Sequence, residues 1–375
     1  MTTTVIHRAD RVLLPERLTA PGWVEIGSGQ VLAAGVGAPP RPADVDHRDA
    51  TLSPGLVDIH CHGGGGSSFT DGVEAARGAR AAHLRAGTVA TVASLVSAPV
   101  PALAAQCAEL ATLVEAGVLA GIHLEGPWLS PGRRGAHDPR ALAVPTPADV
   151  ETLVSAARGT LRMVTLAPEL PGAVDAVRQL VANGVAVAIG HSDADEGEAR
   201  RAIDAGASVA THLFNAMRPL SHRSPGIIGA CLASPEVTVE LIADGVHLAP
   251  TVTALAARSA LGGFALVTDA IAAAGQGDGS YVLGGLDVDV ADGVARLAGT
   301  DTIAGSSLLL LDAVRHAVLQ AGLPLEQALQ AATRTPAEVL RIGGLGVIAP
   351  GVTAPLIVLD AQLRLSAVVD PRATP

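Results

Sequence analysis

Two imidazole side chains, His60 and His62, lie two residues apart directly after a short apolar segment. On an extended strand, residues at this spacing project from the same face. Imidazole nitrogen binds zinc, iron and similar ions, so the pair predicts a metal site. The alternative is that one histidine ends a strand and the other belongs to the glycine-rich loop that follows. Cys61, between them, is expected on the opposite face as a small core residue.

A carboxylate and two further histidines complete a candidate ligand set. Glu125, His191 and His212 each follow another apolar segment. A buried carboxylate is costly unless it is paired or binds a cation. Together the three residues form a mixed nitrogen and oxygen set with room for water, which is typical of catalytic rather than closed structural metal sites. The alternatives are packed histidines and an ion pair of Glu125 with Arg133 or Arg134.

Asp269 follows the last apolar segment of the middle region. A carboxylate beside a metal-activated water can accept its proton and pass it to a leaving group. The alternative is a helix N-cap, where aspartate is common. The chain contains no lysine, and all 25 basic residues are arginine. Schiff-base lysines, P-loop lysines and a carboxylated lysine between two metals are therefore excluded, which leaves Glu125 as the natural anionic bridge or ligand.

Composition narrows the class of protein further. The chain has 375 residues, 49% of them hydrophobic and 16% charged, with a formal net charge of -11. Such a chain is not disordered, and its acidic balance argues against nucleic-acid and anionic-membrane partners. The three cysteines are widely spaced and do not suggest a disulfide framework, so a cytoplasmic location is expected. The uncharged segment 86–108 is long enough to span a bilayer, but its prolines and hydroxyl residues favour a strand followed by a helix.

Eight apolar segments alternate with amphipathic segments in the middle of the chain. The expected strands are 55–59, 87–94, 118–123, 161–166, 185–189, 208–211, 237–242 and 264–267, and helices are expected over 73–85, 102–115, 174–182 and 196–205. Near-continuous apolar strands are typical of a parallel sheet buried on both faces. Eight of them alternating with helices predict a (β/α)8 TIM-like barrel. The alternative is an open doubly wound sheet, but no Gly-x-Gly-x-x-Gly turn follows an early strand.

The two ends of the chain have β character instead. Segments 23–26 and 30–32 form a predicted hairpin, and segments 356–359 and 365–369 are predicted strands. We therefore expect residues 1–51 and 345–375 to form one small β-sandwich domain beside a barrel of residues 52–344. In such a barrel the carboxyl ends of the strands converge on the face where active sites lie. The candidate ligands all follow predicted strands, so they are expected on that face.

Six motifs, taken in order, resemble a known family. They are PGLVDIHCHG at 54–63, HLEGP at 123–127, GHS at 190–192, THLFNAM at 211–217, DGVH at 244–247 and TDA at 268–270. The set resembles the N-acetylglucosamine-6-phosphate deacetylases, a branch of the amidohydrolase superfamily. The first motif is common across the superfamily, whereas HLEGP and THLFNAM are more specific. The resemblance implies the barrel, the β-sandwich domain and a homodimer.

The resemblance also implies roles for individual residues. Glu125, His191 and His212 would hold the main divalent metal ion, and Asp269 would be the catalytic acid and base. Because His60 and His62 are present, a second ion bridged by Glu125 is expected, so each subunit would bind one or two. Zinc is the expected ion, with iron or another divalent metal as the alternative.

The substrate contacts implied by the resemblance come from several loops. They are Ala136, His137, Asn215, Ala216, Arg223, His247, Ile303, Ala304 and Gly305. Arg223 resembles the family's phosphate-binding arginine, and an arginine fork suits phosphate. One or both of Arg223 and His247 would reach across a dimer interface. The alternatives are a surface charge for Arg223 and a loop hydrogen bond for His137.

The implied reaction is hydrolysis of the acetamide of N-acetylglucosamine 6-phosphate, a small phosphosugar, in amino-sugar catabolism. A metal-bound water would be the nucleophile, with Asp269 as general base and then acid. Two other interpretations stay open. One is a different amidohydrolase, acting on N-acetylgalactosamine 6-phosphate or a cyclic amide, and the other is a non-catalytic metal-binding relative.

Overall fold

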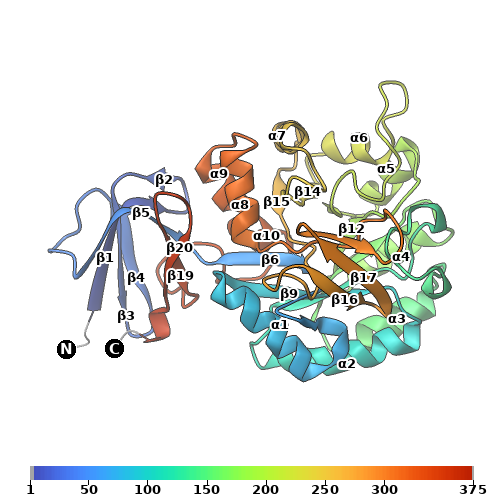
Figure 1. Ribbon diagram of the computed structural model, residues 1–375, viewed down its shortest axis with the longest axis horizontal. Coiled ribbons are helices and arrows are strands. Elements are labelled where there is room, and N and C mark those ends of the chain that lie inside the picture. The colour runs from blue at the N-terminus through green and yellow to red at the C-terminus, as the bar shows by residue number, and fades with distance from the viewer. Residues whose placement is uncertain (1–3, 374–375) are drawn as a thin grey trace.

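Eight parallel strands form the barrel of the computed structural model, which describes residues 4–373 (Figure 1). In the order in which they pair, they are β6 (Leu56–Cys61), β9 (Thr88–Val96), β10 (Gly121–Glu125), β11 (Leu161–Leu166), β12 (Ala186–Ile189), β13 (Val209–Ala210), β14 (Thr238–Leu241) and β15 (Phe264–Leu266). The two ends of this sheet meet where the amide of Asp269 donates to the carbonyl of His60 at 2.9 Å. The predicted TIM-like barrel is confirmed.

The strand β10 differs from its predicted bounds. Prediction placed it at 118–123, but it runs over Gly121–Glu125, and residues 118–120 belong to the turn after α2. In this register Glu125 pairs with Val96 on one side and Thr165 on the other. Glu125 is therefore the last residue of the strand rather than part of the following loop, and its side chain is held by the barrel itself.

Helices follow the strands and cover the outside of the barrel (Figure 1). They are α1 (Val73–Arg85), α2 (Val100–Glu115), α3 (Pro147–Ala156), α4 (Ala173–Ala182), α5 (Glu196–Asp204), α6 (Gly226–Leu232), α7 (Pro250–Ser259), α8 (Leu310–Leu319), α9 (Leu325–Ala331) and α10 (Arg334–Val339). The uncharged segment 86–108 forms β9 and the start of α2, as predicted. Within residues 4–373, no helix is both long enough and apolar enough to cross a membrane.

The two ends of the chain meet in one seven-stranded sheet beside the barrel. Its strands are β1 (Thr4–Leu13), β2 (Leu18–Thr19), β3 (Gly22–Gly27), β4 (Gln30–Val36), β5 (Val45–Pro54), β19 (Leu356–Leu359) and β20 (Leu365–Val369). The predicted hairpin is β3 with β4, and β19 pairs with β5. The small domain built from both termini is thus confirmed, while the exact boundaries at 51/52 and 344/345 stay a prediction.

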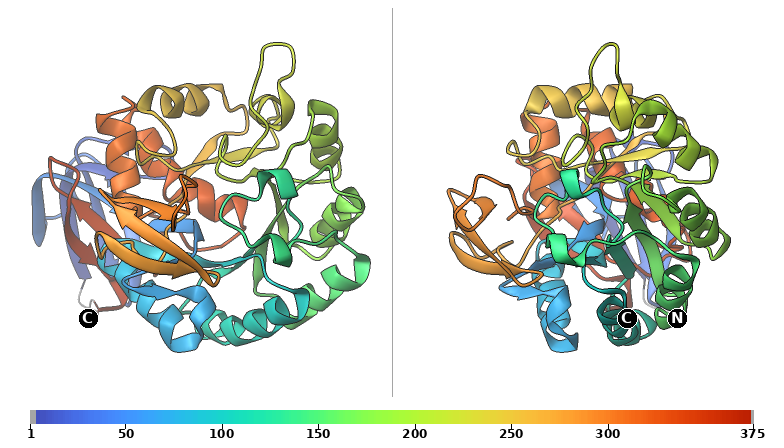
Figure 2. Two further views of the ribbon diagram at one scale, coloured as in Figure 1. Left: turned by 45° about the vertical axis from the view of Figure 1, so that its right-hand side comes forward. Right: turned by 90° about the vertical axis from the view of Figure 1, so that its right-hand side faces the viewer.

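A third sheet was not predicted. It contains β16 (Gly279–Leu283), β17 (Leu286–Ala291) and β18 (Val294–Leu297), and Figure 2 shows it in orange, projecting beyond the barrel. Alternating apolar residues of this sheet pack with Val96 and Ile271 at the barrel mouth. A short hairpin of β7 (Gly63–Gly64) and β8 (Ser67–Ser68) follows β6.

The packing of α2 against the barrel generates a stability prediction. Leu103 on α2 is 0% exposed, so Leu103→Ala should destabilise the protein by roughly 2–5 kcal/mol, from lost burial and the cavity left behind. A matched control is Leu319→Ala on α8, where the leucine is 57% exposed and the expected change is within about 0.5 kcal/mol. Unfolding temperatures measured by calorimetry compare the two, and equal losses would contradict the packing described.

Candidate metal centre and active site

Glu125, His191 and His212 bring three possible ligand atoms together. The Nε2 atoms of His191 and His212 each lie 3.0 Å from Oε1 of Glu125 and 3.1 Å from each other. In a tetrahedral zinc site with bonds of about 2.0–2.1 Å, ligand atoms lie about 3.4 Å apart. The three side chains, all buried, therefore fit around one ion with little rearrangement.

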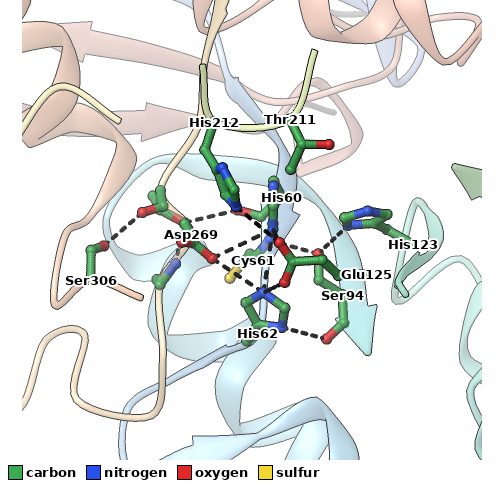
Figure 3. Close-up of polar contacts among 12 residues, drawn as sticks. His60, Cys61, His62, Ser94, His123, Glu125, Thr211, His212, Asp269 and Ser306 are labelled. Carbon is green, nitrogen blue, oxygen red and sulfur yellow. Dashed lines mark hydrogen bonds and ion pairs between the residues drawn. The ribbon is translucent and has the colours of Figure 1, made fainter. Parts of the chain in front are cut away.

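The same carboxylate also belongs to a second group (Figure 3). Nε2 of His62 lies 3.1 Å from Oε2 of Glu125 and 3.1 Å from Oδ1 of Asp269. Nε2 of His60 lies 3.3 Å from Nε2 of His62 and 3.4 Å from the same Oδ1. Glu125 is thus shared by two neighbouring groups, which is the arrangement of a carboxylate that bridges two ions.

The hydrogen bonds behind these rings determine which nitrogen faces the site. Nδ1 of His191 donates to the carbonyl of Arg133 at 2.9 Å, and Nδ1 of His62 donates to the carbonyl of Ser94 at 3.1 Å. Nδ1 of His60 lies 2.9 Å from the Glu240 carboxylate. Because these oxygens can accept from Nδ1, each ring keeps a proton there and turns Nε2 to the site, where this nitrogen can bind a proton or a cation.

His137 has the opposite orientation of its proton. Its Nδ1 accepts a hydrogen bond from the amide of Ser97 at 3.2 Å, so the proton of the neutral ring is on Nε2. Burial lowers the pKa of His137, which favours that neutral ring. Nε2 lies 3.2 Å from Oε2 of Glu125. His137 is therefore a hydrogen-bond donor in this site and not a metal ligand.

The electrostatics of the site require positive charge. Burial lowers the pKa of His62, but hydrogen bonds to Asp269 and Glu125 outweigh burial and raise it to about 9. Burial also raises the pKa of Glu125, yet the imidazoles around it leave that pKa well below its ordinary value. Among the described residues, the carboxylates of Glu125 and Asp269 form ion pairs only with histidines. The donor set and its charge thus fit divalent cations.

Sharp turns at the strand ends aim the site residues at the barrel mouth. His191, His212 and Asp269 all have positive φ, at 47°, 25° and 50°. Such conformations are rare for non-glycine residues and cluster at functional sites, where surrounding contacts hold them. The expectation that the strand ends converge is met by these residues.

Two alternative interpretations of the site residues are wrong. Asp269 does not cap a helix among the described elements, and Arg133 pairs with Asp193 at 2.8 Å rather than with Glu125.

A cavity of about 410 Å³ opens above the two groups. Predicted site residues that line it are His62, Glu125, Ala136, His137, His191, His212, Asn215, Ala216, His247, Asp269, Ile303 and Gly305. His60 and Ala304 are fully buried and do not line the cavity. Nδ1 of His247 donates to Asp244 at 2.7 Å; burial lowers the pKa of His247, but Asp244 outweighs burial and raises it.

The amino-acid sequence of the chain is similar to those of known proteins. The sequence model described as "Amidohydrolase family" matches residues 51–373. The chain belongs to the amidohydrolase family. It is 38% identical to an N-acetylglucosamine-6-phosphate deacetylase of Vibrio furnissii, over 84% of this chain and 80% of the relative. It is 36% identical to an N-acetylgalactosamine-6-phosphate deacetylase of Escherichia coli O157:H7, over 96% of this chain and 97% of the relative.

A solved structure of a similar protein agrees in fold. It is a mutant of the N-acetyl-D-glucosamine-6-phosphate deacetylase of Mycobacterium smegmatis in complex with N-acetyl-D-glucosamine-6-phosphate. The identity is 46%, each chain is covered to 98%, and the TM-score is 0.95. The resemblance predicted from the motifs is therefore confirmed for this amidohydrolase.

The phosphate-binding candidate Arg223 does not line the cavity of its own chain. It lies in an exposed turn between β13 and α6. Figures 1 and 2 show the segment between these two elements in yellow-green, extending away from the barrel. A different arginine, Arg133, does line the cavity, and sequence reasoning missed it as a cavity residue. Val96 and Leu283 also line it, and Leu283 comes from the unpredicted sheet. The one sequence signal for Arg133 is that it lies close in sequence to His137, in a loop already expected to contact the substrate.

Removing bound metal from this amidohydrolase should lower its unfolding temperature. A ligand present at 100 times its dissociation constant stabilises a fold by about 2.7 kcal/mol, or roughly 3 °C in a chain of this size. Calorimetry with and without a chelator measures the shift, and added zinc should restore it. Glu125→Gln removes the shared carboxylate, so the chelator should leave this variant unchanged. The same shift in both proteins would place the ion elsewhere.

Proposed function

We propose that this amidohydrolase hydrolyses the acetamide of N-acetylglucosamine 6-phosphate to glucosamine 6-phosphate and acetate, in amino-sugar catabolism. The observation that carries the proposal is the opposed orientation of the imidazoles. Three rings present Nε2 lone pairs to Glu125 or its neighbours, whereas His137 presents an N–H at the same place. Such a site can hold cations and donate to an amide carbonyl. The substrate is the one named for the Vibrio and Mycobacterium relatives.

The residues that would hold the metal are those of the two groups. Glu125, His191 and His212 would bind one ion, and His60, His62 and Asp269 the other, with Glu125 shared. A divalent ion bound there would polarise an amide carbonyl and make a water molecule more acidic. We propose zinc, with iron as the alternative, because imidazole and carboxylate ligands suit both.

The chain's own side chains would move the protons. Asp269 would take a proton from the attacking water as its oxygen bonds to the carbonyl carbon, and would then give that proton to the amine nitrogen as the carbon–nitrogen bond breaks. The N–H of His137 would stabilise the negative charge that develops on the carbonyl oxygen. Ser306 and His60 hold the backbone of Asp269 through hydrogen bonds of 2.8 and 2.9 Å, so its position is set in advance.

The remaining lining residues suit a small polar ligand with one apolar group. Asn215, His247 and the loop of Ile303, Ala304 and Gly305 would contact the sugar, as would backbone groups of Ala136 and Ala216. Val96 and Leu283 provide an apolar part of the wall, and the acetyl methyl is the substrate's one apolar group. The amide of Ser97, next to Val96, orients His137, which puts this apolar wall near the scissile carbonyl.

We further propose a homodimer in which Arg223 of one subunit binds the phosphate held by the other. The support is its position on an exposed, extended turn outside its own cavity. The cytoplasm is the proposed location, because the three cysteines are all buried free thiols.

Acetate release from four sugars tests the proposal directly. The panel is N-acetylglucosamine and N-acetylgalactosamine, each with and without 6-phosphate, before and after chelation. Fastest release from N-acetylglucosamine 6-phosphate, abolished by the chelator, is expected. Faster release from the galactosamine epimer would reassign the substrate, and no release from any sugar would contradict the proposed reaction.

Asp269→Asn tests the acid and base. The amide cannot accept the proton of the attacking water, so kcat should fall by about 10²–10⁴-fold or more. The ion at Glu125, His191 and His212 should stay bound, as metal analysis of the purified variant would show. Turnover within about tenfold of the parent protein would remove Asp269 from the reaction.

Arg223→Ala tests the phosphate contact. A hydrogen bond to a charged group contributes roughly 1.5–3 kcal/mol, so kcat/KM for the phosphorylated sugar should fall about 10- to 100-fold, mostly through KM. The value for the unphosphorylated sugar should barely change. Arg48→Ala, at an arginine whose side chain is 83% exposed on the terminal sheet, is the control. An equal fall in kcat/KM for both sugars would show that Arg223 does not bind the phosphate.

A further inference from the structure

Glu240 is a buried acid that the proposed reaction does not use. It lies on β14 and is 0% exposed. Its neighbours Val239 and Leu241 belong to the apolar core between the barrel and its helices. Because side chains alternate along a strand, Glu240 points the other way, into the barrel beneath the cavity, where its contacts reach the ligand residues.

One oxygen of Glu240 contacts both groups of ligands. Oε2 lies 2.9 Å from Nδ1 of His60, which belongs to the group with His62. The same atom accepts the backbone amide of His212 at 3.1 Å. The carbonyl of Glu240 also accepts the amide of Leu213 at 2.8 Å. Glu240 thus holds the ring of His60 through its side chain and the left-handed turn at His212 through both side chain and backbone.

The contacts of Glu240 with the chain satisfy only one of its two oxygens. Among the described residues its only ion-pair partner is His60. Its second oxygen, Oε1, is buried without a hydrogen-bond partner. A buried carboxylate in this condition is costly unless positive charge lies close by. The other side of the His60 ring, where Nε2 faces His62 and Asp269, is a place for such charge.

We propose that Glu240 is a positioning residue that favours a second divalent ion at His60 and His62. The inference rests on the two-ion form of the proposed function. A carboxylate behind a ligating imidazole fixes the ring and makes its free nitrogen a stronger ligand. Its negative charge, added to those of Glu125 and Asp269, brings three carboxylates to the site, which is more negative charge than a single divalent ion neutralises.

Glu240→Gln separates this role from simple packing. The amide oxygen can take the place of Oε2 and keep both hydrogen bonds, so the main change is the loss of charge. Zinc is titrated into the metal-free protein by calorimetry, and the bound metal is counted by elemental analysis. The parent protein should bind two ions. In the variant the second ion should bind about 10- to 100-fold more weakly, while the first keeps its affinity within about threefold.

Glu169→Gln is the matched control. Glu169 accepts from Oγ of Ser192 and from the amide of Asp193, both at 2.7 Å, and bonds to no ligand ring. Its loss should leave the second ion's affinity unchanged. If Glu240→Gln does not fold, Glu240→Asp serves the same titration, because the shorter side chain withdraws from His60 and should also weaken the second ion selectively.

The outcomes separate this inference from the proposed function. An unchanged second-ion affinity in the Glu240 variant would overturn the inference, even with a lower unfolding temperature of the metal-free protein, because that is what a purely structural role predicts. Equal weakening of both ions would overturn it as well. Both results leave deacetylation by the two-ion parent protein standing. A parent protein that binds one ion contradicts the inference and the two-ion form, and one that binds none contradicts the proposed function too.

Discussion

Buried carboxylates without arginine or lysine partners are the constraint on which this active site depends. Glu125 and Asp269 lie in the barrel mouth and pair only with histidines among the described residues. The chain has no lysine that could neutralise them. A desolvated negative charge must be balanced locally or it destabilises the fold. Imidazoles with their Nε2 lone pairs turned inward offer that balance only through a proton or a bound cation.

The barrel supplies the geometry that makes this balance possible. Parallel pairing aligns the carboxyl ends of β6, β10, β12 and β13 at one mouth, so ligands far apart in sequence become neighbours. Positive φ angles at His191, His212 and Asp269 then turn the chain sharply over that mouth. Backbone carbonyls and the Glu240 carboxylate behind the rings fix which nitrogen faces inward. Strand pairing, turn conformation and ring orientation therefore act together on the same few atoms.

Much of this could be predicted because strong apolar periodicity and ordered motifs point the same way. The predicted bounds of β11 and α1 agree with the structure, and the ligand residues gather as the strand-end argument requires. Register was less predictable, because the turn after α2 and the start of β10 are both apolar. The sheet β16–β18 was missed because its exposed acidic residues, such as Asp287 and Asp289, resemble a loop. Ring orientation in His137 depends on the amide of Ser97, which only the folded chain brings near.

Anomalous diffraction from crystals of the zinc-loaded protein tests the central claim most directly. Data collected at the zinc absorption edge locate each ion independently of the protein coordinates. The account predicts two peaks on either side of the Glu125 carboxylate, one within bonding distance of His191 and His212 and the other of His60 and His62. Loaded crystals without a peak between Glu125, His191 and His212 would contradict it.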